Sequence, residues 1–192
     1  MNTVDNSLYT RQWYEDKIGA TKSQQFFWYL VHIIFFVNPF SISSKLKVWI
    51  LRLFGARVGK GVIIRTGVRI RYPWKLFIGD NSWLEEQVWI DNMANVAIGK
   101  NVCISQGAML QTRTHNQATR EFDLMLMTIT LEDGVWIGAR SVVCPGVTCK
   151  THSVLTVQSV AFHNLEAFTI YQGNPAVAKK ERMIQAKKVY KA

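Results

Sequence analysis

The chain has 192 residues, 48% of them hydrophobic, and a formal net charge of +10. This length allows one main domain with short appendages, and three cysteines without a C-x-x-C pair exclude a disulfide framework and indicate reduced thiols in a cytosolic protein. The charge would suit nucleic acid, but no nucleic-acid motif accompanies it, and anionic cofactors or an anionic membrane surface explain it equally well.

An apolar run occupies residues 26–37, inside an N-terminal segment, residues 1–57, that contains no repeat. Its only polar residue is His32, which we expect to be a satisfied or interfacial histidine. A helix across a bilayer needs about twenty apolar residues, and this run is shorter. It also lacks the basic start and the cleavage site of a signal peptide. We therefore predict a helix that ends at Asn38-Pro39.

A second helix is predicted over residues 45–54, because Ser43 or Ser44 can cap its start and Gly55 can end it. We interpret residues 1–57 as a helical cap over the open end of the next domain. The alternative is a membrane-surface contact in which the apolar run enters the headgroup region. The cations that would then face lipid phosphates are Lys45, Lys47, Arg52 and Arg57.

A six-residue repeat governs the middle of the chain, residues 58–166. The clearest part reads IGDNSW, LEEQVW, IDNMAN and, after a two-residue step, IGKNVC, ISQGAM, LQTRTH; the pattern resumes at Leu131. The first place is aliphatic and the fifth is small or β-branched. Neither the strand period nor the helix period explains a strict six. The repeat is typical of a parallel β-helix, in which three sixes form one triangular coil, so we predict an all-β core.

The repeat is interrupted in two places. Tyr72-Pro73-Trp74 breaks it near its start, where four cations form either a solvated face or a site for an anionic acceptor such as a sugar phosphate. A longer break, residues 116–130, is predicted as an inserted loop, and such loops in regular solenoids often carry function. The four cations are Arg65, Arg69, Arg71 and Lys75.

The chain leaves the repeat at Asn164 and forms a C-terminal tail, residues 167–192. A turn is expected at residues 171–176. The segment from Pro175 to Lys188 is basic and begins with a proline, which predicts a short C-terminal helix.

His115 is the only histidine in the acidic middle of the repeat, and the long loop follows it directly. Its place in the hexad predicts a coil corner, with Asn95 one coil below and Thr148 one coil above. A histidine there could remove a proton near neutral pH, although the group that orients its second nitrogen is not visible in the sequence; the alternative is an exposed corner histidine. Zinc chemistry would need three convergent histidines, and only His115 is suitably placed, so no metal is expected.

Several stretches together resemble the hexapeptide-repeat acetyltransferases: the sixes, TRTHN before the loop, ITLEDGVWIGARSVVCPGV and YQGNPA. VWIDNMANVAIGKNVCISQGAML, with the preceding RYPWKLFIGDNSW, is similar to the colanic-acid and exopolysaccharide O-acetyltransferase branch. The resemblance covers about residues 46–182. It implies a left-handed β-helix, acetyl-CoA as acetyl donor, a saccharide acceptor that is lipid-linked or free, and a cytoplasmic homotrimer with active sites between adjacent subunits.

The resemblance also implies roles for individual residues. His115 would be the general base that deprotonates the acceptor hydroxyl, which attacks the acetyl-CoA thioester directly, and a nearby amide would stabilise the oxyanion. The acceptor would lie near Glu85, Asp91 and Asn92. The cofactor would be bound by Trp136, Gly138, Ala139, Val157, Ser159, Phe162, His163, Lys179, Lys180 and Arg182.

Three departures from the family pattern concern this site. Glu85 stands where galactoside and maltose acetyltransferases have an asparagine, so the acceptor must be held differently. Bulkier residues at 156–159, TVQS in place of GAGS, could narrow the cofactor channel. Phe162 and His163 replace a Thr-Lys pair and either contact the adenine and a phosphate or form ordinary surface. These departures leave a non-catalytic β-helical scaffold or membrane-surface interaction protein as the alternative function.

Overall fold

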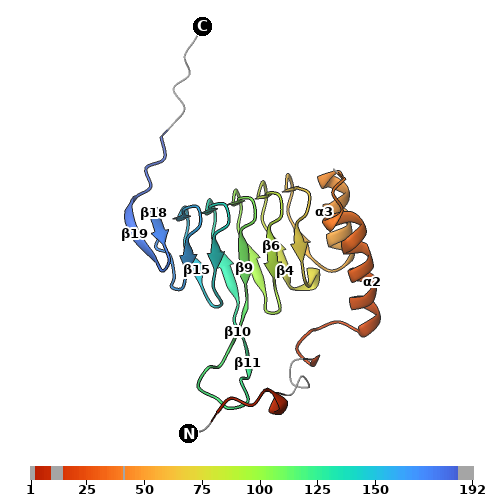
Figure 1. The fold of residues 1–192 in the computed structure, drawn as a ribbon. Coiled ribbons are helices and arrows are strands. Elements are labelled where there is room, and N and C mark those ends of the chain that lie inside the picture. Colours follow the sequence, from red (N-terminus) through yellow and green to blue (C-terminus); the bar gives the residue numbers. More distant parts are fainter. Residues whose placement is uncertain (1–2, 10–14, 41, 186–192) are drawn as a thin grey trace.

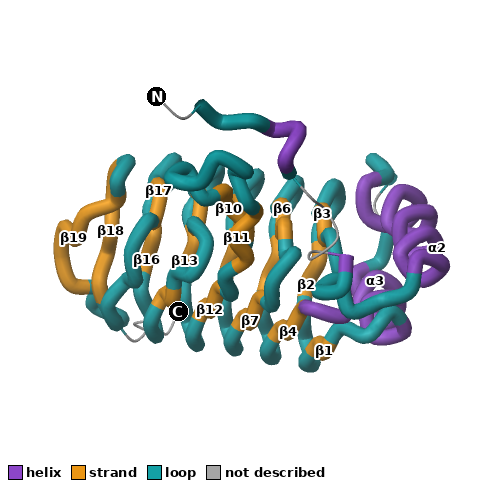
Figure 2. Tube along the Cα trace, turned by 90° about the horizontal axis from the view of Figure 1, so that it is seen from below, coloured by secondary structure: helices purple, strands orange, loops and turns teal. Residues whose placement is uncertain are grey.

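The central part of the molecule is a parallel β-solenoid of about six turns, seen in Figures 1 and 2. The computed structural model describes residues 3–9, 15–40 and 42–185. Three parallel sheets form the faces of a triangular prism, and successive strands along the chain enter the three sheets in turn. The β-helix predicted from the six-residue repeat is therefore confirmed.

The strands of each sheet stack along the axis of the prism. Sheet A contains β1 (Arg57–Val58), β4 (Leu76–Ile78), β7 (Val96–Ile98), β12 (Ile129–Leu131) and β15 (Thr148–Cys149). Sheet B contains β2 (Ile63–Ile64), β5 (Trp83–Leu84), β8 (Cys103–Ile104), β13 (Trp136–Ile137), β16 (Val154–Leu155), β18 (Thr169–Gly173) and β19 (Ala176–Glu181). Sheet C contains β3 (Arg69–Ile70), β6 (Trp89–Asp91), β9 (Met109–Gln111), β14 (Val142–Val143) and β17 (Val160–Ala161).

The core is a set of aliphatic files, one behind each sheet. In sheet B the parallel register places the first-place residues of the hexads directly over one another. This file consists of Ile64, Leu84, Ile104, Ile137 and Leu155, each at most 1% exposed. The small fifth-place residues are also buried, as at Ser82, Val102 and Val135. Burial of one such aliphatic side chain contributes about 1.5–3 kcal/mol, so each member of a file stabilises the coil by about this amount.

Irregularities of the coil gather on one edge of the prism, between sheets C and A, which we term the C–A edge. Phe77 pairs with Arg57 twenty residues earlier, whereas Thr148 pairs with Thr130 eighteen residues earlier. In the longer coils the two extra residues lie on the C–A edge, where η3 (Pro73–Lys75) forms a turn. The same edge opens further on into a hairpin of β10 (Arg113–His115) and β11 (Leu124–Leu126), which projects from the solenoid in Figure 1.

Two helices cover the end of the solenoid at which the coil begins (Figure 1). They are α2 (Lys22–His32), which continues as the π-helical turn η2 (Ile33–Val37), and α3 (Ser44–Leu53). Thr21 caps α2 by accepting the amide hydrogen of Gln24 at 3.2 Å. None of the helices in the described part of the chain is both long and apolar enough to cross a membrane.

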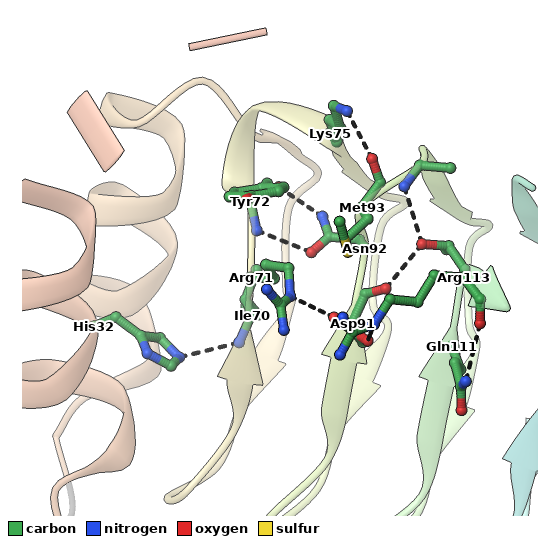
Figure 3. A network of polar contacts seen from close by, with 12 residues as sticks. His32, Ile70, Arg71, Tyr72, Lys75, Asp91, Asn92, Met93, Gln111 and Arg113 are labelled. Atoms are coloured by element: carbon green, nitrogen blue, oxygen red, sulfur yellow. Dashed lines mark hydrogen bonds and ion pairs between the residues drawn. The ribbon is translucent and has the colours of Figure 1, made fainter. Parts of the chain in front are cut away.

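Polar side chains attach these helices to the first coil. Trp28 donates its indole N–H to the carbonyl oxygen of Ile70 at 3.1 Å, and His32 Nε2 accepts the Ile70 amide hydrogen at 3.0 Å, as Figure 3 shows for His32. Burial lowers the pKa of His32 from 6.5 to about 4. His32 is therefore neutral at physiological pH and is a satisfied histidine at the interface between helix and coil.

The predicted C-terminal helix is wrong over the described residues. The chain instead forms the antiparallel hairpin β18–β19, whose turn contains the cis Asn174-Pro175 bond. Ile170 of β18 pairs with Val154 of sheet B, so the hairpin extends that sheet and satisfies the backbone groups at its end. This tertiary pairing overrides the local helix signal, and residues 186–188 lie outside the described part of the chain.

Candidate active site

His115 lies at the end of β10, on the projecting hairpin, and not at a coil corner as predicted. It pairs with Leu124 of β11 across the hairpin. The strand that continues sheet A above β7 is β12 and not β10, because Ile129 of β12 pairs with Val96 of β7. Asn95 therefore neighbours Ile129, and Thr148 pairs with Thr130, so neither residue flanks His115.

The ring of His115 is oriented by the inserted loop. Its Nδ1 lies 2.7 Å from the carbonyl oxygen of Phe122, and the two rings stack with centroids 4.3 Å apart at an interplanar angle of 5°. A carbonyl oxygen can only accept a hydrogen bond, so Nδ1 must carry the proton of the neutral ring. The lone pair is then on Nε2. This tautomer leaves Nε2 as an acceptor for a substrate proton.

The loop is held in a conformation that directs this carbonyl toward the histidine. Phe122 has φ of 49°, in the left-handed region, and its carbonyl oxygen faces the histidine ring nitrogen. Asn116 N donates to Asp123 O at 2.8 Å across the base of the loop. The N-terminal segment adds a further contact, because the Tyr9 ring lies 6.1 Å from the His115 ring. A hollow of about 360 Å³ lies beside the histidine and is lined by Gln111, Arg113, Thr114, His115, Gln117 and Phe122.

Asp91 ties the hairpin to the coil. Its carboxylate is 1% exposed and accepts a hydrogen bond from Arg113 Nε at 2.7 Å on one oxygen and from Arg71 Nε on the other (Figure 3). Arg113 lies in β10, two residues before His115. A buried carboxylate is stable only when it is paired in this way. Asp91 therefore holds the root of the strand that carries His115.

Asn92 has a comparable role inside the C–A edge. Its amide oxygen accepts the Tyr72 amide hydrogen at 3.0 Å, and its amide nitrogen donates to the Tyr72 carbonyl oxygen at 2.6 Å. The side chain is fully buried. The predicted contact of Asp91 and Asn92 with the acceptor is not supported by this burial, because both side chains are engaged within the coil.

A second group of predicted residues lies on the opposite side of sheet C, at the edge between sheets B and C, which we term the B–C edge. Glu85 N donates to Ile104 O, and Ser105 N to Ile137 O, so residues 85, 105 and 138 follow one another up this edge. Burial, reinforced by the neighbouring Glu86, raises the pKa of Glu85, and Arg65 at 3.7 Å opposes the shift.

The B–C edge continues into the residues predicted to bind the cofactor. Trp136 is 47% exposed on the outer face of sheet B, and its indole N–H donates to Ser105 Oγ at 3.0 Å. Gly138 is required by packing, since a Cβ atom there would lie 2.5 Å from Val157 N. The amide of Gly138 donates to Leu155 O at 2.7 Å and is not available to an oxyanion. Ala139 follows Gly138, and Val157 is exposed on the next coil.

The remaining predicted residues are spread over other parts of the coil. Ser159 is buried, and its hydroxyl accepts the Gly173 amide hydrogen at 3.0 Å. Phe162 and His163 are exposed after sheet C, on the same edge as the hairpin. Lys179 and Lys180 are exposed on β19, whereas Arg182 donates to Gly134 O at 2.8 Å and to His152 O at 3.1 Å.

One chain therefore divides the predicted site between two edges of the prism. His115 projects from the C–A edge, whereas Glu85 and the residues around Trp136 lie along the B–C edge, with a face of the prism between them. The sequence did not reveal Phe122 as the group that orients His115, because that contact depends on loop geometry. Arg71 as a partner of Asp91 could have been found, since the two are one twenty-residue coil apart.

Comparison with known proteins agrees with these observations. The chain is 35% identical over 165 residues to WcaF of Escherichia coli K12, whose name describes it as a colanic acid biosynthesis acetyltransferase. The match covers 86% of this chain and 90% of WcaF. No family model matches the chain.

Two solved structures share the fold. A hexapeptide-repeat acetyltransferase of Vibrio cholerae in complex with acetyl-coenzyme A aligns with a TM-score of 0.70 at 22% identity, over 75% of this chain and 80% of that one. A galactoside acetyltransferase in complex with coenzyme A aligns with a TM-score of 0.70 at 20% identity, over 93% and 89% of the two chains. Together with the identity to WcaF and the hexad-based coil, they lead to one conclusion: the chain belongs to the hexapeptide-repeat acetyltransferase family.

Proposed function

We propose that the protein is an acetyl-CoA-dependent O-acetyltransferase that acetylates a saccharide hydroxyl in surface or exopolysaccharide biosynthesis, with His115 as general base. The observation that carries the proposal is the contact between His115 Nδ1 and the Phe122 carbonyl oxygen, which leaves the Nε2 lone pair free to accept a proton. Nε2 takes the proton of the acceptor hydroxyl as that oxygen becomes the nucleophile. A histidine in this role typically contributes a factor of about 10²–10⁴ to the rate.

The described residues fit acetyl-CoA as the donor. The outer face of sheet B presents the exposed indole of Trp136 and continues through β16 and β18 to β19, which carries the exposed cations Lys179 and Lys180. These features suit a long ligand with a reactive thioester at one end and phosphates at the other. The thioester end would lie near Trp136 and the open corner at Gly138, and the distant cations would meet the phosphates. When bound, acetyl-CoA supplies the acetyl group in activated form.

The division of the site between two edges supports a homotrimer with intersubunit sites. In such a trimer, three equivalent interfaces would bring the C–A edge of one copy against the B–C edge of the next. Each interface would then join His115 of one copy to Glu85 and Trp136 of its neighbour. We propose in addition that the coils are left-handed. In a closed ring of three copies, every C–A edge faces a B–C edge, so the same pair of edges forms all three interfaces. The mass of the protein in solution, measured by light scattering, tests this part of the proposal.

Transfer of labelled acetyl from acetyl-CoA to a panel of saccharides, lipid-linked oligosaccharides included, tests the reaction. The wild type should label at least one saccharide, and His115→Ala should lose the activity while keeping its oligomeric mass and its acetyl-CoA affinity by calorimetry. Activity of His115→Ala near the wild-type rate would refute the assignment of the base. A wild-type protein with no affinity for acetyl-CoA would refute the function.

A further inference from the structure

The helical cap of the solenoid exposes two apolar stripes, which together we term the cap surface. In α2 and η2 the exposed residues recur at helical spacing along one side, and α3 has a second such row. Large apolar residues gathered in this way mark an interaction surface. The cap surface consists of Phe26, Phe27, Tyr29, Leu30, Ile33 and Ile34 of the first stripe and Leu46, Trp49 and Leu53 of the second, all between 39% and 67% exposed.

The opposite sides of the same helices are committed to the coil. Trp28 donates to the carbonyl oxygen of Ile70, and Phe36, fully buried, accepts the Gly67 amide hydrogen through its backbone carbonyl. In α3 the buried Lys47 donates to Arg65 O at 2.8 Å. These contacts fix which side of each helix faces away from the solenoid, and in Figure 1 both helices lie at its very end. The cap surface is therefore a preformed outer face.

The segment that forms the cap and the first coil carries charged residues of one sign. From residue 17 to residue 79 the sequence contains eleven Lys and Arg residues and no acidic residue. Some of these cations bond backbone carbonyls, as Arg52 does to Val58 O at 2.7 Å, but Lys22, Lys45 and Arg57 are exposed. An aromatic and aliphatic face on a segment that carries only cations is complementary to an anionic lipid surface, where apolar side chains enter the acyl boundary and cations meet phosphates.

We infer that the cap surface docks the protein onto an anionic membrane, with Trp49 and Phe27 inserted at the level of the headgroups. Trp side chains favour this level because one end of the ring is apolar and the other is polar, and Phe side chains of interfacial helices enter the adjoining acyl boundary. A second copy of the chain fits the surface less well, since two identical faces would bring cations against cations. The inference rests on the cap alone and does not depend on the proposed acetyl transfer.

Co-sedimentation of the full chain with vesicles tests the inference. The wild type should sediment with phosphatidylcholine vesicles that contain phosphatidylglycerol, weakly with phosphatidylcholine alone, and less as salt is raised, because salt screens surface charge. Phe27→Ser with Trp49→Ser should abolish sedimentation. The matched control is Val177→Ser with Ile184→Ser, which removes two exposed apolar residues near the C-terminal end of the coil and should sediment like the wild type.

A second pair of variants separates charge from folding. Lys22→Glu with Lys45→Glu should weaken binding by about 30-fold or more, since each lysine near an anionic surface contributes about a fivefold factor. Both lysines lie in the first turn of their helices, where a glutamate is favourable, so the helices should remain folded. Lys179→Glu with Lys180→Glu makes the same charge change on β19 and should bind vesicles like the wild type.

Three results would overturn the inference. The first is failure of the wild type to sediment with the anionic vesicles. The second is unchanged sedimentation of Phe27→Ser with Trp49→Ser. The third is a change of oligomeric mass in that variant by light scattering, which would assign the cap surface to contacts between copies of the chain.

Discussion

The carbonyl oxygen of Phe122 lies 2.7 Å from Nδ1 of His115 while the two rings stack in parallel, so one residue sets both the tautomer and the plane of the candidate base. The loop that bears Phe122 is thus part of the site rather than only a cover over it. Since a side-chain substitution leaves the carbonyl in place, the two contributions can be separated experimentally.

Phe122→Gly should lower kcat by about two- to tenfold with a smaller change in KM, because a lost aromatic stack costs about 0.5–1.5 kcal/mol and glycine keeps the left-handed backbone at this position. Steady-state kinetics with the acceptor found in the saccharide panel measure the effect. Phe168→Gly is a matched control: Phe168 has φ of 51° and stacks on His152 at 4.8 Å, and its loss should leave kcat unchanged. Equal effects of the two variants would argue against a role of the stack in the reaction.

Asp91→Asn should destabilise the protein by about 3 kcal/mol, because it leaves two guanidinium groups around a buried site without their counter-charge. The two arginines are about one-third exposed, which reduces the cost from the upper part of the usual range. Denaturant unfolding measures the loss. If Asp91 positions the hairpin, kcat should fall as well under conditions where the variant is fully folded; an unchanged kcat would restrict Asp91 to stability.

Stability should fall as the pH is lowered from 6.5 to about 4 because of His32. Its pKa is about 4 in the folded protein against 6.5 when unperturbed, so the unfolded chain binds more protons in this window. The contribution of neutral His32 is complete above pH 6.5 and is lost as the pH approaches 4. A shift of this size corresponds to about 3 kcal/mol.

Thermal melts of the wild type and of His32→Gln across that range check the prediction. The variant should be less stable at neutral pH, and its melting temperature should depend less on pH. Parallel curves for the two proteins would contradict the role assigned to His32.

Glu85→Gln should raise the KM for the acceptor by about tenfold with little change in kcat, if the carboxylate at the B–C edge accepts a hydrogen bond from a sugar hydroxyl. Hydrogen bonds to charged groups contribute about 1.5–3 kcal/mol. Glu86→Gln, an exposed neighbour with the same charge change, should leave KM unchanged. An unaltered KM in Glu85→Gln would show that the acceptor is held by other groups.

Family membership supports an enzyme over the scaffold considered from the sequence alone. The unusual residues at 156–159 do not distort the coil: Thr156 N bonds Tyr171 O at 2.9 Å, and Ser159 is buried where a small residue is needed. The substitution of bulkier residues at this corner therefore changes the outer surface, where Val157 is 60% exposed, and leaves the core unchanged.

The six-residue repeat was enough to predict the coil, because a strict six-residue period is explained when aliphatic residues such as Ile104 and Leu155 stack in files. It also located His115 next to the inserted loop. The contacts between individual residues became known from the three-dimensional arrangement of the strands. Strand pairing places His115 on a hairpin outside the coil and forms β19 in place of the predicted C-terminal helix. Ion pairs place Asp91 between Arg71 and Arg113. These contacts depend on cross-strand and side-chain hydrogen bonds, which local propensity does not encode.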